Sequence, residues 1–153
     1  MRDVTAAGLE QTIRTYFDGC NEANIGKMTS CMEPEAVHYF PAGAPQGTFA
    51  GAESIARGWV RAVETLGSIW TVDHVIVDAS RLEAVIEWTH FKPKQGIYLR
   101  GDEWYRFSKA GLITEIRAYY ACPAAVPPKT HEIGDFDYET RGFPLKPPRI
   151  AGR

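Results

Sequence analysis

Residues 82–120, LEAVIEWTHFKPKQGIYLRGDEWYRFSKAGLITEIRAYY, contain three stretches in which apolar and polar side chains alternate. The stretches are Leu82–Phe91, Ile97–Phe107 and Leu112–Tyr120, and the turn Ser108–Gly111 separates the last two. Alternation with a period of two is typical of a half-buried β-strand. This part of the chain therefore predicts a three-stranded antiparallel meander with one face toward a core or a pocket.

The residues before the meander show helical spacing of apolar side chains in some segments and β-branched or aromatic runs in others. We predict three helices, Val4–Glu22, Ile25–Met32 and Ala52–Leu66, and three strands, Ala36–Phe40, Thr48–Ala50 and Ser68–Asp78. Helices segregated from a run of antiparallel strands indicate an α+β domain.

Composition narrows the class of protein. A chain of 153 residues with a formal charge of −2 gives no electrostatic case for binding nucleic acid or an anionic membrane, so a small neutral partner fits better. The three cysteines form no C-x-x-C pair and are expected to be reduced. The sequence shows no signal-peptide pattern and no apolar run of membrane-spanning length, so a cytoplasmic location is expected.

The composition changes at Cys122. Six of the ten prolines follow it, which predicts an irregular or extended tail over residues 122–153 beside a domain over residues 1–121. The tail also contains Phe136, Phe143 and Leu145 and is too apolar for a free segment. We expect it to pack across the mouth of a pocket or onto a neighbouring subunit.

The order of these elements and several short motifs together resemble the SnoaL-like branch of the nuclear-transport-factor-2-like superfamily. The motifs are Tyr16 in the first helix, HYFPAG at 38–43, G-x-E-x-x-A from Gly51, and RGDEWYRFSKAGLITEIRAYY at 100–120. The likeness covers about residues 6–121. It implies a cone, in which a curved mixed or antiparallel sheet wraps around about three N-terminal helices and encloses a deep pocket. Members include isomerases, dehydratases, hydrolases, polyketide cyclases, lyases and pockets that catalyse nothing, so the fold alone does not set the function.

The resemblance places some residues of this chain at functional positions of the family. Tyr16 falls at the oxyanion-stabilising tyrosine of ketosteroid isomerase, and Glu103 falls at or beside its carboxylic acid, but Phe40 replaces its general base. Ala118 replaces the final-strand aspartate of limonene epoxide hydrolase. His74 aligns with the pocket histidine of scytalone dehydratase. The segment IGDFDYETRGF at 133–143 is similar to the C-terminal segment that covers that enzyme's pocket.

The candidate catalytic residues are His74, Glu87, Glu103 and Tyr16. A buried carboxyl group has its pKa raised toward a useful range, and a histidine can carry a proton in either direction. Both glutamates face inward in the register that also turns Val85, Phe91, Tyr105 and Phe107 inward, which is the register we prefer. The opposite register would instead place Trp88, His90, Arg100, Asp102 and Trp104 in the pocket. Each candidate also has a structural alternative: a hydrogen-bonded core histidine or tyrosine, or a solvent-exposed or salt-bridged glutamate.

The candidate substrate-binding residues are His38, Phe40, Trp59, Thr89, Phe91 and Tyr120. No metal site is expected, because the four histidines lie on separate segments without a ligand-spacing motif. No cofactor is expected either, since the sequence contains no glycine-rich phosphate-binding loop.

These observations predict a cofactor-independent lyase that uses general acid/base catalysis on a small, mainly apolar aromatic or polycyclic substrate. The reaction would be a dehydration or a retro-aldol cleavage. The alternatives are an isomerase or polyketide-cyclase type of enzyme with the same pocket, and a non-catalytic ligand-binding or assembly domain. In the preferred register Trp88 and Trp104 lie on the outer face of the sheet, and such an aromatic patch predicts a homodimer.

Overall fold

The computed structural model of the chain describes residues 4–41, 44–120, 139–140 and 142–152. In chain order its elements are α1 (Ala6–Asn21), α2 (Ile25–Thr29), β1 (Met32–Tyr39), β2 (Phe49–Ala50), α3 (Ala52–Leu66), β3 (Ile69–Asp78), β4 (Glu83–Lys92), the short 3-10 helix η1 (Pro93–Gln95), β5 (Ile97–Phe107) and β6 (Ile113–Tyr119). The predicted bounds of α3 and β5 are confirmed, and the largest differences from the predicted bounds are at α2 and β1.

Local side-chain chemistry sets the ends of the helices. The hydroxyl of Thr5 accepts the backbone N–H of Gly8 at the start of α1, and the side chain of Asn24 accepts that of Lys27 at the start of α2. Gly67 ends α3 with a φ of 68°, a left-handed conformation that favours glycine.

The boundary between α2 and β1 differs from the prediction. Helix α2 ends at Thr29, and Met32, which was predicted to be helical, begins β1. The hydroxyls of Thr29 and Ser30 donate to carbonyls of the preceding turn, which helps to satisfy the acceptors that the helix leaves free at its end. The carbonyl of Cys31 already accepts the N–H of Ile113, so pairing with β6 takes over from the helix.

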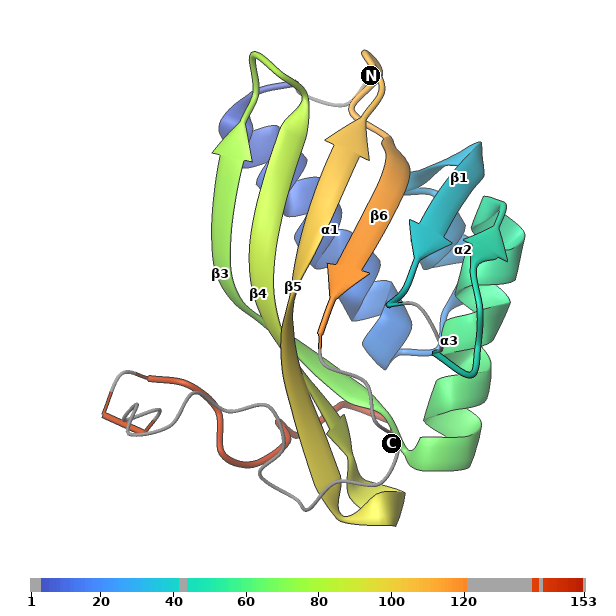
Figure 1. The fold of residues 1–153 in the computed structure, drawn as a ribbon, viewed down its shortest axis with the longest axis vertical. Coiled ribbons are helices and arrows are strands. Elements are labelled where there is room, and N and C mark those ends of the chain that lie inside the picture. The colour runs from blue at the N-terminus through green and yellow to red at the C-terminus, as the bar shows by residue number, and fades with distance from the viewer. Residues whose placement is uncertain (1–3, 42–43, 121–138, 141, 153) are drawn as a thin grey trace.

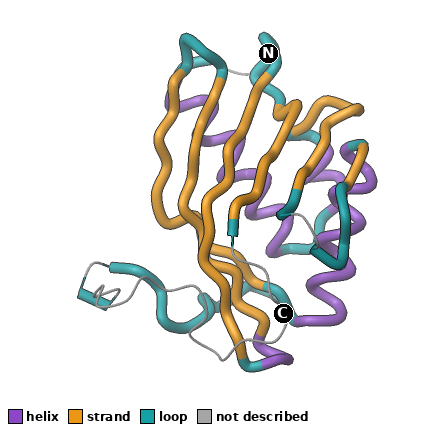
Figure 2. The backbone as a smooth tube through the Cα atoms, viewed as in Figure 1, coloured by secondary structure: helices purple, strands orange, loops and turns teal. Residues whose placement is uncertain are grey.

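The six strands form a single open mixed sheet in the order β2-β1-β6-β5-β4-β3. The β1 and β6 strands are parallel, whereas all other neighbours are antiparallel. Figure 1 shows α1 running across one face of this sheet, and Figure 2 shows all three helices on that same side. The predicted α+β fold, a curved sheet with helices on one face, is confirmed.

The core lies between the sheet and the helices. Leu9, Ile13 and Tyr16 lie in the buried stripe of α1. Burial of an aliphatic side chain such as Leu9 or Ile13 contributes about 1.5–3 kcal/mol. The side-chain amide of Asn21 donates to the carbonyl of Trp70 and accepts its N–H, at 2.9 and 2.8 Å. This pair of bonds fixes the C-terminal end of α1 against the start of β3.

Among the described residues, every helix is too short or too polar to cross a membrane.

Candidate functional site

The pairing register decides which side chains of β4 and β5 face the helices. Ile86 lies opposite Glu103, and both are buried, whereas Glu87 lies opposite Asp102 on the other side of the sheet. We call the side toward α1 and α3 the inner face and the opposite side the outer face. Glu103 points inward, as the preferred register predicts. The predicted inward orientation of Glu87 is wrong.

The inner face carries a buried pair of titratable groups. The side chain of Glu103 is 9% exposed, and its Oε1 lies 3.5 Å from Nε2 of His38, which is completely buried. The hydroxyl of Tyr105 donates to the other carboxylate oxygen at 2.5 Å. Nδ1 of His38 lies 3.2 Å from the carbonyl oxygen of Tyr39. Because a carbonyl only accepts, Nδ1 is assigned the proton, and the lone pair of Nε2 faces Glu103.

Tyr16 reaches the same region from α1. The indole N–H of Trp59 donates to its hydroxyl oxygen at 2.6 Å. Burial, with the neighbouring Cys20 and Glu103, raises the pKa of Tyr16 well above its ordinary value. Burial and Glu103 likewise raise the pKa of Tyr105. Both phenols therefore keep their protons and act as hydrogen-bond donors.

Aromatic rings surround the imidazole. Phe40 stacks on His38 with ring centroids 4.2 Å apart and planes 11° apart, and Trp59 meets His38 edge-on at 5.3 Å. Trp59 also contacts Phe49 and Trp70. These contacts hold the imidazole in one orientation within an apolar environment. Phe40 and Trp59, both predicted to bind substrate, thus lie beside His38.

Two buried nitrogen atoms in the described part of the chain make no hydrogen bond: Nε2 of His38 and Nε1 of Trp88. The preferred register placed Trp88 on the outer face, and this is wrong, because Trp88 lies on the inner face and is 4% exposed. Tyr120, another predicted substrate-binding residue, packs edge-on against it at 5.7 Å. Trp104 does lie on the outer face.

Four of the predicted site residues lie on the outer face instead of the inner one. His74 pairs with Glu87 across β3 and β4, Thr89 lies opposite Arg100, and Phe91 packs beside Tyr98. Nδ1 of His74 is 2.7 Å from a carboxylate oxygen of Glu87. The structure therefore brings together Tyr16, His38, Phe40, Trp59 and Glu103, and it separates His74, Glu87, Thr89 and Phe91 from them.

The outer face at Thr89 is covered by the described end of the chain. The hydroxyl of Thr89 donates to Asp73 at 2.6 Å and accepts from Arg100 at 2.7 Å. Arg100 also donates to the carbonyl of Pro144 at 3.0 Å and lies over the ring of Phe143. Burial raises the pKa of Asp73. Part of the predicted tail thus packs on the sheet, while residues 122–138, 141 and 153 of it lie outside the described residues.

A second buried histidine joins the end of α3 to β4. Nε2 of His90 lies 2.8 Å from the hydroxyl of Ser68, and its ring stacks on Trp70 at 4.5 Å. Burial, with a smaller effect of Lys92, lowers the pKa of His90 well below its ordinary value. His90 is therefore neutral and ties the two elements together. In the described part of the chain, no three His, Cys, Asp or Glu side chains gather closely enough to hold a metal ion.

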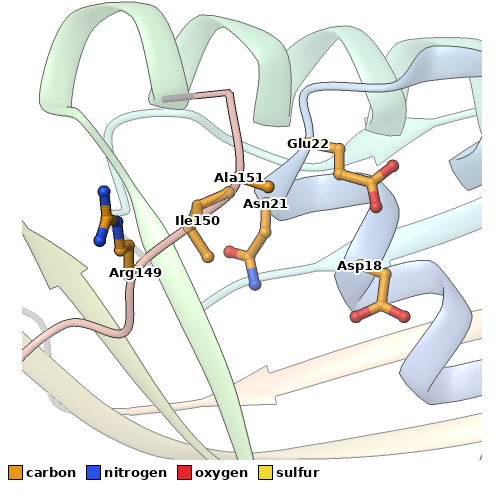
Figure 3. Close-up of a pocket in the computed structure, with 6 residues that line it drawn as sticks. All are labelled: Asp18, Asn21, Glu22, Arg149, Ile150 and Ala151. Carbon is orange, nitrogen blue, oxygen red and sulfur yellow. The ribbon is translucent and has the colours of Figure 1, made fainter.

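A surface hollow of about 290 Å³ lies at the C-terminal end of α1. It is lined by Asp18, Asn21, Glu22, Arg149, Ile150 and Ala151. Figure 3 shows Arg149 on one side of the hollow and the carboxylates of Asp18 and Glu22 on the other. The hollow marks where the end of the chain meets α1, and it contains none of the inner-face residues described above.

The chain was compared with protein-family models and with curated proteins. Residues 13–116 match the family model described as the SnoaL-like domain. None of the curated proteins matches the chain.

Several solved structures are similar over most of their length. A protein of unknown function with a cystatin-like fold from Methylobium petroleophilum PM1 is 55% identical, with a TM-score of 0.75, covering 95% of this chain and 97% of its own. A protein from Kribbella flavida provisionally named a ketosteroid isomerase is 15% identical, with a TM-score of 0.64 and coverage of 84% and 90%. One from Sinorhizobium meliloti provisionally named a polyketide cyclase is 18% identical, with a TM-score of 0.60 and coverage of 71% and 94%. The last two likenesses concern the fold alone.

Proposed function

Because the chain belongs to the SnoaL-like domain family, we propose that it is a cofactor-independent lyase that eliminates water from a small aromatic or polycyclic molecule. The observation that carries the proposal is the buried pair of Glu103 and His38, with Oε1 and Nε2 3.5 Å apart, beside the hydroxyl of Tyr16. Two titratable groups in a buried site can serve as the general acid and the general base of a reaction that uses no metal or cofactor.

The proposed reaction needs one exchangeable proton in the pair, carried by Oε1 of Glu103 or by Nε2 of His38. With the proton on Glu103, Nε2 of His38 is free to take a proton from a carbon next to a carbonyl group. Glu103 then gives its proton to the departing hydroxyl, and water leaves. The proton on His38 returns to Glu103, which restores the pair, so the substrate loses one water and the protein is unchanged.

Tyr16 supplies the donor for the negative charge that develops on the carbonyl oxygen. Its hydroxyl accepts from Trp59 and also interacts with the thiol of Cys20, so in the proposed step its proton turns from Cys20 to the substrate. A fixed donor of this kind typically contributes a factor of about 10²–10³ to the rate. The rings of Phe40 and Trp59 would contact the flat apolar part of the substrate.

Glu103→Gln tests the proposal, with Glu87→Gln on the outer face as the matched control. A panel of aromatic β-hydroxyketones is incubated with each protein, and products are identified by the loss of one water in mass spectrometry. We expect Glu103→Gln to lower kcat by about 10²–10⁴ while ligand binding persists, since that is the usual contribution of a general acid. Equal activity of Glu103→Gln and the wild type would refute the assignment, and a comparable loss in Glu87→Gln would move the chemistry to the outer face.

An isomerase is the second candidate, since the same pair can return the proton to a different carbon. It predicts a product of unchanged mass from the same panel. Ligands that bind without any conversion would support a non-catalytic binding domain.

We also propose that the protein is a cytoplasmic homodimer. The reduced, buried Cys20 and Cys31 suit a reducing compartment. The outer face carries a row of exposed apolar side chains, including Ile76 and Trp104, which suits contact with a second copy.

A further inference from the structure

Trp88 is a buried hydrogen-bond donor whose partner is missing from the described part of the chain. Its side chain is 4% exposed, and its indole nitrogen makes no hydrogen bond to any described residue. Buried donors in folded proteins are almost always paired with protein, water or ligand. An indole N–H can only donate, so the missing partner is an acceptor such as a carbonyl, hydroxyl or ether oxygen.

The backbone opposite Trp88 is shaped to hold the indole in this position. Gly101 lies directly opposite on β5, and a Cβ there would fall 2.7 Å from the indole ring and 2.8 Å from the carbonyl of Tyr119. Only glycine allows so close an approach. The ring also meets Tyr120 edge-on, with centroids 5.7 Å apart and planes 74° apart. The direction of the N–H is therefore fixed by packing.

Trp88 and Glu103 are neighbours on the inner face. Glu103 lies opposite Ile86, and Trp88 is the next inward-facing residue on β4, so the two are related diagonally across the strand pair. Diagonal neighbours of an antiparallel pair are about 7–8 Å apart. That separation is comparable to the length of one fused bicyclic ring system, so a single flat molecule can meet both groups.

We propose that Trp88 is a second substrate anchor, whose N–H binds an oxygen at the end of the molecule opposite the one that Glu103 and His38 act on. The substrate is then a fused aromatic or polycyclic compound with oxygen functions at both ends. The assignment of the reacting end rests on the proposed function. The anchor itself is a binding claim and can be tested separately.

The test compares a naphthol, which has one hydroxyl, with a naphthalenediol that has one hydroxyl on each ring, by calorimetric titration. The proteins are the wild type, Trp88→Phe, which keeps a ring but lacks the N–H, and Trp104→Phe as the matched control on the outer face. We expect the second hydroxyl to tighten binding about tenfold in the wild type and in Trp104→Phe, the value of one hydrogen bond. In Trp88→Phe this gain should disappear.

Absence of the gain in the wild type, or its persistence in Trp88→Phe, would overturn the proposal. If Trp88→Phe fails to fold, the NMR resonance of the Trp88 indole N–H in the wild type shows whether this N–H binds the second hydroxyl. It should shift downfield with the diol and not with the naphthol, and an unchanged resonance with both would overturn the anchor. The variant Glu103→Gln distinguishes the Trp88 anchor from the proposed lyase function. If the second hydroxyl still tightens binding to Glu103→Gln, while the wild type converts no substrate, the anchor is supported and the lyase function is refuted.

Discussion

His90 is the residue whose protonation should matter most for stability below neutral pH. Its pKa is lowered well below the ordinary value of about 6.5, chiefly by burial, so the folded protein binds this proton less readily than the unfolded chain. The stabilising contribution is complete above about pH 6.5. It is lost as the pH falls from there toward the folded-state pKa, at up to about 1.4 kcal/mol per pH unit.

We therefore predict that His90→Gln flattens the decline in the free energy of unfolding between pH 6.5 and pH 5. Glutamine can keep a hydrogen bond to Ser68 but does not titrate. Urea unfolding of both proteins across this range provides the measurement, and the difference between the two curves cancels all other titrating groups. Parallel curves for the two proteins would show that His90 is not the group responsible.

Strand β4 shows why the sequence predicted the meander but not its inward face. Within β4, Trp88, Thr89, His90 and Phe91 are all buried, so burial does not alternate there. The inner side of this stretch packs on the core, while Thr89 on the outer side lies in the network that Arg100 extends to the end of the chain. A strand covered on both faces has no period-two signal to read. On β5, where Trp104 is exposed and its neighbours are buried, the preferred register was correct.

The end of the chain should contribute measurable stability through Phe143. This side chain is 8% exposed and lies beside the His74 ring and under the Arg100 guanidinium. We predict that Phe143→Ala lowers the free energy of unfolding by about 1.5–3 kcal/mol, the value of burying such a side chain, and speeds tryptic cleavage after Arg149. Leu145→Ala is the control, because Leu145 is 43% exposed and should change little. Equal stability of the two variants would mean that Phe143 does not anchor the segment.

At the scale of the whole molecule, the proposed site is a product of topology. His38 on β1 and Glu103 on β5 are far apart in sequence, and they meet because β6 lies between these strands. His38 and Tyr105 both pair with Ile116 of β6, one from each side. The sequence indicated His38 and Glu103 separately as candidate site residues, and the family resemblance implied the cone-shaped fold. The partnership of His38 with Glu103 required the parallel pairing of β1 with β6, which no local pattern encodes.

The same topology builds the surface on which the homodimer prediction rests. On the outer face, Ile76, Val85, Trp104, Arg117 and Tyr39 form one continuous row across five strands. Ile76 is 71% exposed, and Trp104 and Tyr39 are each at least 40% exposed. A row of this kind, apolar except for Arg117, is costly in water on a monomer and is typical of an interface. A second copy that presents the same row would cover both surfaces through a two-fold axis.

We predict that the wild type sediments as a dimer at micromolar concentration and that Trp104→Lys sediments as a monomer. The new ammonium group would be buried beside Arg117, whose guanidinium lies over the Trp104 ring. Glu115 already pairs with Arg117, so the added positive charge would be uncompensated, which is strongly unfavourable in an interface. Thr65→Lys, on the exposed side of α3, adds the same charge away from the row and should remain dimeric. A monomeric wild type would remove the sheet face from consideration as an interface. A dimer that survives Trp104→Lys would place the contact elsewhere on the molecule.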